Sequence, residues 1–357
     1  KIADYNIKPI NPNQVLLSIK KNVHSQQHVT ERTTADYQAE FGRISTSLSA
    51  ARDFAEWCNI YKKLVNWEVE LTDSTDNSVK EILAYQKNEA NNEFGKFIRR
   101  NYLDWINHRD GKTPVMSHTL LKTHVFPEVG QGRKTTLLVI DNFRYDQWRS
   151  IDQLISNYYD IEKDDFYCSI LPTATQYARN ALFAGLMPLA IDKIMPDRWP
   201  NDNEEGGKNK YEEDFLRRQI QAMGKDWKAT SDKLIRPEQG RKLIDNIQHV
   251  YDADLSVIVY NFLDILSHAR TETEIIRELT EDEAAFRSLT RSWFEHSDLY
   301  TLLKMLSQKG HTIIITTDHG TIRVDNPIKI VGDRETSVNL RYKTGRNLTY
   351  NPKEVFE

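Results

Sequence analysis

The sequence predicts an α/β protein in which a domain built on a parallel sheet follows a helical region. The sheet is predicted from runs rich in apolar and β-branched residues, at 135–140, 255–263 and 311–317. Helical stretches lie between these runs, notably at 143–156, 236–250 and 296–309. Strands that alternate with helices along a chain usually pair in parallel, with helices on both faces of the sheet.

The composition is that of a globular protein without a general affinity for polyanions. Of the 357 residues, 39% are hydrophobic and 28% are charged, and the formal net charge is -4. No apolar run approaches the roughly 20 residues that span a bilayer, and no signal peptide opens the chain. Cys58 and Cys168 lie far apart, which predicts two reduced, buried thiols. We therefore expect a cytoplasmic protein with no membrane partner.

The first 22 residues are typical of a strand followed by a helix. Residues 4–7 read as a short strand that Pro9 ends, and an Asn-Pro pair then caps a helix at 12–21. The strand has nothing upstream to pair with, so we expect the chain to start inside a domain. The polar residues 23–33 are predicted to be a linker.

Residues 34–108 have a helical pattern. Apolar residues recur at alternating spacings of three and four from Phe41 to Cys58, which is the seam that two packed helices need. A loop with capping residues is predicted at 72–77. A second long helix follows, with an apolar face from Val79 to Trp105. We expect an α-hairpin or small bundle whose aromatic residues pack in its core. Further on, residues 186–234 are predicted to be an inserted surface lid.

Each of the three predicted strands ends in an aspartate, namely Asp141, Asp264 and Asp318. The carboxyl ends of parallel strands meet at one edge of the sheet, and carboxylates that converge there repel one another unless a cation binds. His319 follows Asp318, and His268 lies four residues after Asp264. Imidazole with carboxylate is a common ligand set for zinc. The alternative is that these aspartates only form turns and that His268 is a surface residue.

A candidate nucleophile lies in residues 169–185, where a short strand and a turn precede a helix. Thr175 is predicted at the helix start, where backbone N–H groups and the helix dipole stabilise an alkoxide or a phosphate. Metal coordination would lower the pKa of its hydroxyl further. Thr173 is the competing candidate, and either threonine could instead serve only as an N-cap.

Four motifs give this chain a resemblance to a known family. They are IDNFRYD (140–146), PTATQYARNALFAG (172–185), NFLDILSHAR (261–270) and TTDHG (316–320). In this order they resemble the metal-binding and nucleophile motifs of nucleotide pyrophosphatase/phosphodiesterases in the alkaline phosphatase superfamily, and their details are similar to the PglZ family. The resemblance selects Thr175, because its motif places the threonine three residues after a proline. It implies a zinc-dependent phosphodiesterase.

The resemblance also implies a role for each ligand. One zinc ion would be held by Asp141, Thr175, Asp318 and His319. A second would be held by Asp264, His268 and a further histidine. No such histidine follows His319, so we expect that ligand to lie beyond Glu357. His296 is an alternative, but its helical setting favours a structural role.

Contacts to substrate are predicted from polar residues near these motifs. The resemblance makes Arg144 and Asn180 candidates for the phosphate oxygens, although surface charge and a helix-surface amide are equally open. The expected substrate is a nucleotide or oligonucleotide phosphodiester. The segment 339–347 could grip such a polyanion by charge and stacking, or be a solvated basic loop. Its relevant residues are Arg341, Tyr342, Lys343 and Arg346.

Residues 1–22 resemble the last strand and helix of a receiver domain, in which Lys8 would contact the phosphoryl group. The phosphoacceptor aspartate of such a domain is not in this chain. A receiver part (1–22), a helical linker (23–115) and a PglZ domain (116–357) together resemble the PorX-type response regulators, which control type IX secretion. This resemblance implies a histidine kinase as partner and a homodimer on phosphorylation.

A function of another class remains open. The phosphatase fold could serve as a non-catalytic interaction module that phosphorylation switches in transcription control, with structural metals and a transcription or sigma factor as partner. Nothing in the sequence resembles a helix-turn-helix that reads DNA.

Overall fold

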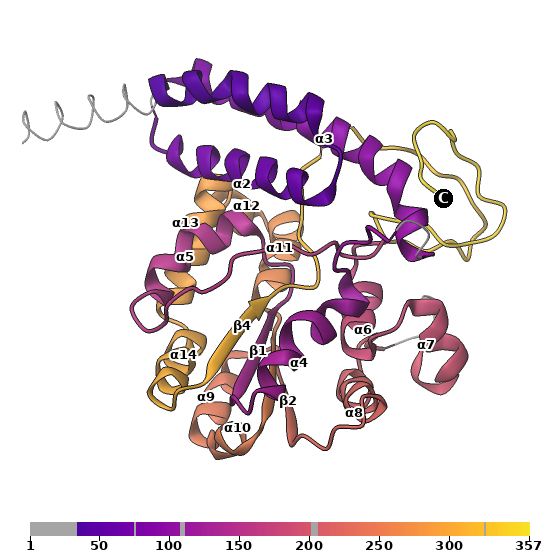
Figure 1. The fold of residues 1–357 in the computed structure, drawn as a ribbon. Helices are drawn as coiled ribbons and strands as arrows, with labels where there is room; N and C mark the ends of the chain where they lie inside the picture. Colours follow the sequence, from indigo (N-terminus) through magenta and orange to yellow (C-terminus); the bar gives the residue numbers. More distant parts are fainter. Residues whose placement is uncertain (1–33, 75, 108–110, 201–205, 325) are drawn as a thin grey trace, which may run out of the picture. The chain divides into compact units, whose positions relative to one another are not determined.

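The structure is a computed structural model, and it describes residues 34–357 apart from 75, 108–110, 201–205 and 325. The chain divides into two compact units, residues 1–100 and 101–357 (Figure 1). The strand and helix predicted in 1–22, with Lys8, lie outside the described residues, as does the predicted linker.

The described part of the first unit is helical, as predicted. Residues 34–50 form a helix, α2 spans Phe54–Glu70, and α3 spans Asn77–Ile106 and so continues into the second unit. The seam predicted from Phe41 to Cys58 is not one helix. It is interrupted because Asp53 caps α2 and accepts a hydrogen bond from the backbone N–H of Glu56.

Aromatic side chains fill the interior of the first unit. Trp57 is 6% exposed, and its ring centroid lies 5.4 Å from that of Phe94 and 5.9 Å from that of Phe97. Tyr37 is also buried and donates a hydrogen bond to Gln86. These contacts confirm core packing for Tyr37, Trp57 and Phe97, whereas Tyr61 and Tyr85 are exposed at 44% and 70%.

The second unit contains the predicted parallel sheet. Its order is β2-β3-β1-β4, and every neighbouring pair is parallel. The strands span Ala229–Leu234 (β2), Leu255–Tyr260 (β3), Thr135–Ile140 (β1) and Thr312–Thr316 (β4). The prediction is confirmed for β1 and β4, whereas β3 ends three residues earlier than expected because the chain turns into a helix there.

Helices cover both faces of the sheet (Figure 1). One core contains Leu138 and Ile140 of β1, and the opposite core contains Leu137 and Val139, as the alternation of side chains along a strand requires. The first core includes residues of α5 (Tyr145–Ile155), α9 (Pro237–Asp245), α10 (Gln248–Asp252), α11 (Phe262–Glu272), α13 (Glu283–Glu295) and α14 (Asp298–Gln308). The second includes residues of η2 (Leu121–Val125), α4 (Phe126–Gly130), α6 (Thr175–Ala184), α7 (Pro188–Ile194) and α8 (Glu212–Ala222).

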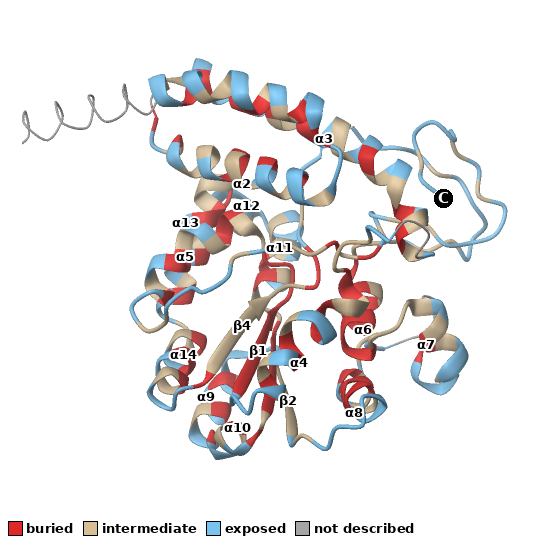
Figure 2. Cartoon of the chain, in the orientation of Figure 1, coloured by how far each residue is buried: buried red, intermediate tan, exposed pale blue. Residues whose placement is uncertain are grey.

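Two further predictions about this unit are corrected. The helix expected at 236–250 is divided into α9 and α10, because the helical backbone stops at Asn246. Residues 186–234 are more than a surface lid. They supply β2 to the sheet and α8 to the core, where Phe215 and Leu216 are buried, as Figure 2 shows for this helix.

Short elements complete the unit. They are η1 (Ser117–Thr119), η3 (Pro196–Arg198) and α12 (Glu274–Leu279). Neither cysteine forms a disulfide within the described residues; Cys168 is buried as predicted, whereas Cys58 is half-buried. In the part of the chain that the structure describes, no helix has the length and apolar character needed to cross a bilayer.

Candidate metal centre

The carboxyl ends of β1 and β4 bring two aspartates together. Asp141 directly follows β1, and its N–H donates to the carbonyl of Tyr260 at 2.9 Å, which extends the β1–β3 pairing by one residue. Asp318 lies two residues beyond β4, and the hydroxyl of Ser169 donates to its carbonyl at 2.7 Å. Both aspartate side chains are fully buried.

Asp141, Asp318 and His319 form a buried cluster of metal-ligand type. One ligand atom from each lies within 4.8 Å of the others. Nε2 of His319 is 3.7 Å from Oδ1 of Asp141 and 3.9 Å from Oδ2 of Asp318. Two carboxylates and an imidazole are the donor set that zinc and similar divalent cations take.

Three properties of the cluster suit a bound cation. Oδ2 of Asp318 is buried and has no hydrogen-bond partner, and Nη1 of Arg179 lies 3.9 Å from it, beyond hydrogen-bond distance. A buried carboxylate oxygen in this setting is costly unless a cation binds it. Burial raises the pKa of Asp141 to about 6, and the neighbouring charge of Asp318 acts in the same direction. Burial also lowers the pKa of His319, which favours the neutral imidazole that metals bind.

Thr175 places its hydroxyl at this cluster. It is the first residue of α6, and its Oγ1 lies 2.9 Å from Nε2 of His319 and 3.4 Å from Oδ1 of Asp141. Thr173 precedes the helix and is joined to the site through its carbonyl, which accepts a hydrogen bond from Arg341. The hydroxyl that meets the cluster is therefore that of Thr175.

Asp264 and His268 lie in α11 rather than at a strand end, which corrects the prediction for Asp264. Asn261 precedes the helix, and Asp264 falls in its first turn. Oδ1 of Asp264 accepts a hydrogen bond from Asn142 at 3.2 Å, and Oδ2 lies 3.7 Å from Nε2 of His268. Burial raises the pKa of Asp264, and the charge of Asp141 adds to this, so the two carboxylates sense each other.

The remaining histidines are placed differently. The side chain of His268 is 69% exposed, so the pair that it forms with Asp264 is open to solvent on one side. His296 ends α13, and its Nδ1 lies 2.8 Å from the carbonyl of Ser292 in the same helix. A contact of this kind, within one helix, fits the structural role that the helical setting of His296 favours.

The two predicted phosphate contacts are engaged with other protein groups. The guanidinium of Arg144 donates to both oxygens of Asp146, at 2.9 and 2.6 Å, and also pairs with Glu283. The amide of Asn180 donates to the carbonyl of Lys208 at 3.1 Å, and its oxygen accepts from Asn209 at 3.0 Å. Their roles toward phosphate stay predictions.

Three site residues were not predicted for the metal cluster. Arg179 of α6 donates to Oδ2 of Asp141 at 2.6 Å, and Asn261 donates to the same oxygen at 2.9 Å. Arg341, which was noted only as part of a basic segment, places Nη1 3.1 Å from Nδ1 of His319. The signal that could have identified Arg179 is its position four residues after Thr175, on the same helical face.

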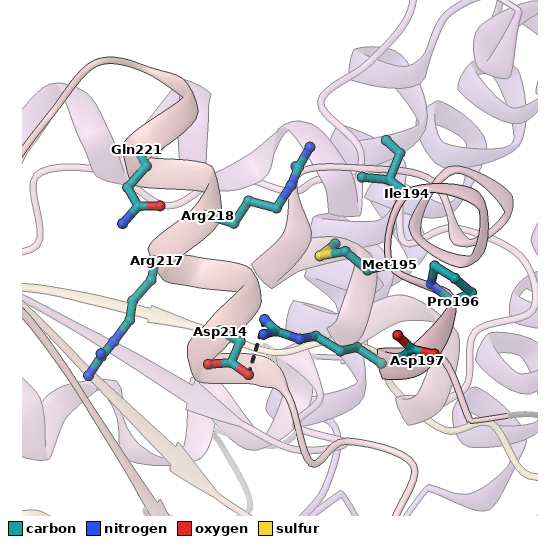
Figure 3. Close-up of a pocket in the computed structure, with 9 residues that line it drawn as sticks. Ile194, Met195, Pro196, Asp197, Asp214, Arg217, Arg218 and Gln221 are labelled. Atoms are coloured by element: carbon teal, nitrogen blue, oxygen red, sulfur yellow. Dashed lines mark ion pairs between the residues drawn. The ribbon is translucent and has the colours of Figure 1, made fainter.

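A separate open pocket lies between α7, η3 and α8 (Figure 3). Its lining includes Met195, Arg198 and Arg218, and Arg198 pairs with Asp214 across it at 3.2 Å. None of the cluster residues lines this pocket. It is therefore not the place where a substrate would meet Thr175.

The second unit thus has a parallel sheet covered on both faces, and a threonine, two aspartates and a histidine gather at the carboxyl edge of that sheet. Residues 120–357 match the family described as the BREX system PglZ alkaline phosphatase-like domain. Because this match covers more than half of the chain, the chain belongs to the PglZ family. Residues 27–106 match the PorX response regulator linker domain. The two matches together support a PorX-type regulator that contains a PglZ domain, and no curated protein gives a significant match.

Proposed function

We propose that the chain is a response regulator whose PglZ domain is a zinc-dependent phosphodiesterase with Thr175 as nucleophile. The observation that carries this proposal is the position of the Thr175 hydroxyl. It lies at the first residue of a helix, 2.9 Å from Nε2 of His319 and beside the carboxylate of Asp141. A hydroxyl between metal-ligand side chains and helix N–H groups is suited to attack a phosphorus atom.

A divalent cation held by Asp141, Asp318 and His319 would stabilise negative charge on the oxygens of the reacting phosphate. Oγ1 of Thr175 would form a bond to phosphorus while the ester bond to the leaving alcohol breaks. Water would then break the bond between phosphorus and Oγ1, releasing a phosphomonoester and restoring the hydroxyl. The pair Asp264 and His268, with a third ligand, would hold a second zinc ion.

Arg341 is the best-placed cation to contact a substrate phosphate. Its guanidinium lies at the carbonyl of Thr173 and at the ring of His319, whereas the guanidinium of Arg144 is taken by carboxylates. The next residue, Tyr342, packs edge-to-face against Tyr177 of α6 with ring centroids 5.3 Å apart. A cation beside aromatic rings suits nucleotide or oligonucleotide phosphodiesters.

A second function is favoured by the exposure of His268. Among the described residues, neither Asp264 nor His268 belongs to the group that Asp141, Asp318 and His319 form, and the side chain of His268 is 69% exposed. Such a centre would also suit a domain whose metals are structural and which binds a transcription or sigma factor. Turnover of a phosphodiester separates this function from the enzymatic one.

Zinc removal tests the enzymatic proposal. We expect the full-length protein to contain zinc and to hydrolyse bis(p-nitrophenyl) phosphate. A chelator should abolish this turnover and added zinc should restore it, because the attacking hydroxyl and the phosphate depend on the same cation. Elemental analysis and release of p-nitrophenol are the measurements. A protein that binds zinc but never turns over the diester, with or without a phosphorylated receiver, would favour the interaction module.

We propose that phosphorylation regulates the protein. We also propose that the pathway to which it belongs serves type IX secretion. A histidine kinase would phosphorylate the receiver, which adds a charge of about -2 near Lys8. We expect beryllofluoride, which imitates an aspartyl phosphate, to convert the full-length protein from monomer to dimer, because the added group favours one of two receiver states.

Light scattering with and without beryllofluoride measures this conversion. Lys8→Ala should abolish the response of the full-length protein. An unchanged mass of the full-length protein in beryllofluoride would contradict the proposed control.

A further inference from the structure

Arg179 is a buried cation inside the candidate metal centre. It is 1% exposed and lies one helical turn after Thr175 in α6. Its Nη1 is 2.6 Å from Oδ2 of Asp141 and 3.9 Å from Oδ2 of Asp318, and its Nε donates to Glu212. A buried guanidinium needs carboxylate partners of this kind, since the cost of removing the charge from water is large.

Glu212 connects Arg179 to the insertion between α6 and β3. It is the first residue of α8 and is 6% exposed. One of its oxygens accepts from Arg179, and the other lies 3.3 Å from Nζ of Lys233 in β2. The orientation of Arg179 is therefore fixed from outside the cluster by two elements that residues 186–234 supply.

The two oxygens of Asp141 have separate partners as a result. Oδ2 accepts from Arg179 at 2.6 Å and from Asn261 at 2.9 Å. Oδ1 faces Thr175 at 3.4 Å and His319 at 3.7 Å. A carboxylate held in this way can offer only Oδ1 to a cation in the cluster.

We propose that Arg179, held by Glu212, is a positioning residue that orients Asp141 for binding a divalent cation. This inference rests on the metal centre of the proposed function. Arg179 acts through its planar fork, which reaches two carboxylates at once, and a lysine cannot reproduce that geometry. The positive charge of Arg179 by itself would repel a cation, so orientation and charge have opposite effects on metal affinity.

The test is the zinc dissociation constant of the full-length protein, measured by competition with a chromogenic chelator. Partners that orient metal ligands commonly contribute about 10–100-fold to affinity. We expect Arg179→Met to weaken zinc binding by about this factor, and Arg179→Lys to weaken it by about tenfold although the charge is kept. The visible absorption spectrum of the cobalt-substituted Arg179→Lys protein should also change, because it senses the geometry of the ligands.

Variants at the other end of the pair separate orientation from charge. Glu212→Gln keeps an oxygen that accepts from Arg179, so we expect zinc affinity within about threefold of native, below the range for a lost orienting partner. Glu212→Leu removes that oxygen and should weaken binding as Arg179→Met does. Lys233→Gln is the control, since it removes a cation from Glu212 but leaves Arg179 in place, and its affinity and cobalt spectrum should be native.

Native affinity and spectrum in Arg179→Lys would overturn the inference, and so would tighter zinc binding in Arg179→Met, which would mean that charge repulsion dominates. Circular dichroism identifies variants that fail to fold. If the other variants fail to fold, the conservative variants Arg179→Lys and Glu212→Gln still test the positioning role of Arg179. If the native protein binds no zinc, the proposed metal centre itself is wrong. If the native protein binds zinc and the variants bind it equally well, the metal centre stands and only the positioning role of Arg179 is wrong.

Discussion

Replacing Thr175 with alanine should abolish hydrolysis of a model phosphodiester. The substitution removes the hydroxyl that lies 2.9 Å from Nε2 of His319 and 3.4 Å from Oδ1 of Asp141. Without an attacking oxygen the covalent route is lost, and a fall in kcat of about 10³-fold or more is expected. The measurement is release of p-nitrophenol from bis(p-nitrophenyl) phosphate at saturating zinc.

Thr173→Ala is the matched control. Thr173 lies two residues earlier, and its carbonyl, which the substitution keeps, accepts the hydrogen bond from Arg341. We expect this variant to retain turnover within about an order of magnitude, far from the loss expected for a missing nucleophile. If Thr173→Ala is inactive while Thr175→Ala turns over the diester normally, the assignment of the nucleophile is wrong.

The thermal stability of Thr175→Ala tests whether its loss of activity comes from the missing hydroxyl or from lost structure. Ala174 is the N-cap residue of α6, with no side-chain cap hydrogen bond, so the helix start does not depend on the hydroxyl of Thr175. Alanine is favourable within a helix. Thr175→Ala should therefore unfold at nearly the native temperature, and a large drop in stability would indicate that lost activity reflects lost structure.

The site residues that could be predicted are those that follow an element recognisable from neighbouring residues in the sequence. Asp141 and Asp318 follow strands rich in apolar and β-branched residues, which are recognisable without knowledge of the fold. The carboxyl edge of a parallel sheet then brings them together. The start of a helix near 175 was predicted from local signals, whereas the choice of Thr175 over Thr173 came from the family resemblance. The short strand expected before the turn is only an isolated bridge at Cys168.

Asp264 was placed at a strand end because the apolar run continues through Phe262 and Leu263. In the structure those two residues belong to the first turn of α11, and Asn261 at its start donates to Asp141 instead of capping the helix with its side chain. Composition alone cannot distinguish a buried strand that continues from a buried helix that begins.

The edge strand β2 was missed for a related reason. Its sequence, ATSDKL, is polar, and only Leu234 at its end is buried. Edge strands tolerate such residues because one side and part of a face remain solvated. Arg179 was missed because an arginine in a helix is normally solvated. Its burial depends on Glu212, which is 33 residues away in the chain.

Asp318→Asn should change metal binding and stability in opposite directions. Asp318 is fully buried, and its Oδ2 has no hydrogen-bond partner. Burial raises the pKa of this carboxyl, so its ionised form costs stability in the metal-free protein at neutral pH. The amide removes that charge but also removes a ligand oxygen from the cluster with Asp141 and His319.

We therefore expect the metal-free Asp318→Asn protein to unfold at the native temperature or above, whereas its zinc affinity falls by more than about 100-fold, beyond the range for residues that only orient ligands. Asp254→Asn is the control, since this carboxylate precedes β3 at the opposite edge of the sheet and pairs with Lys134 at 2.9 Å. Thermal unfolding in chelator at pH 8 and chelator competition are the two measurements.

The opposite signs distinguish a metal ligand from a structural aspartate, because substitution of a structural carboxylate would lower the stability of the protein and leave its zinc affinity unchanged. Native zinc affinity in Asp318→Asn would remove Asp318 from the proposed ligand set, and with it the proposed phosphodiesterase mechanism that depends on the cluster.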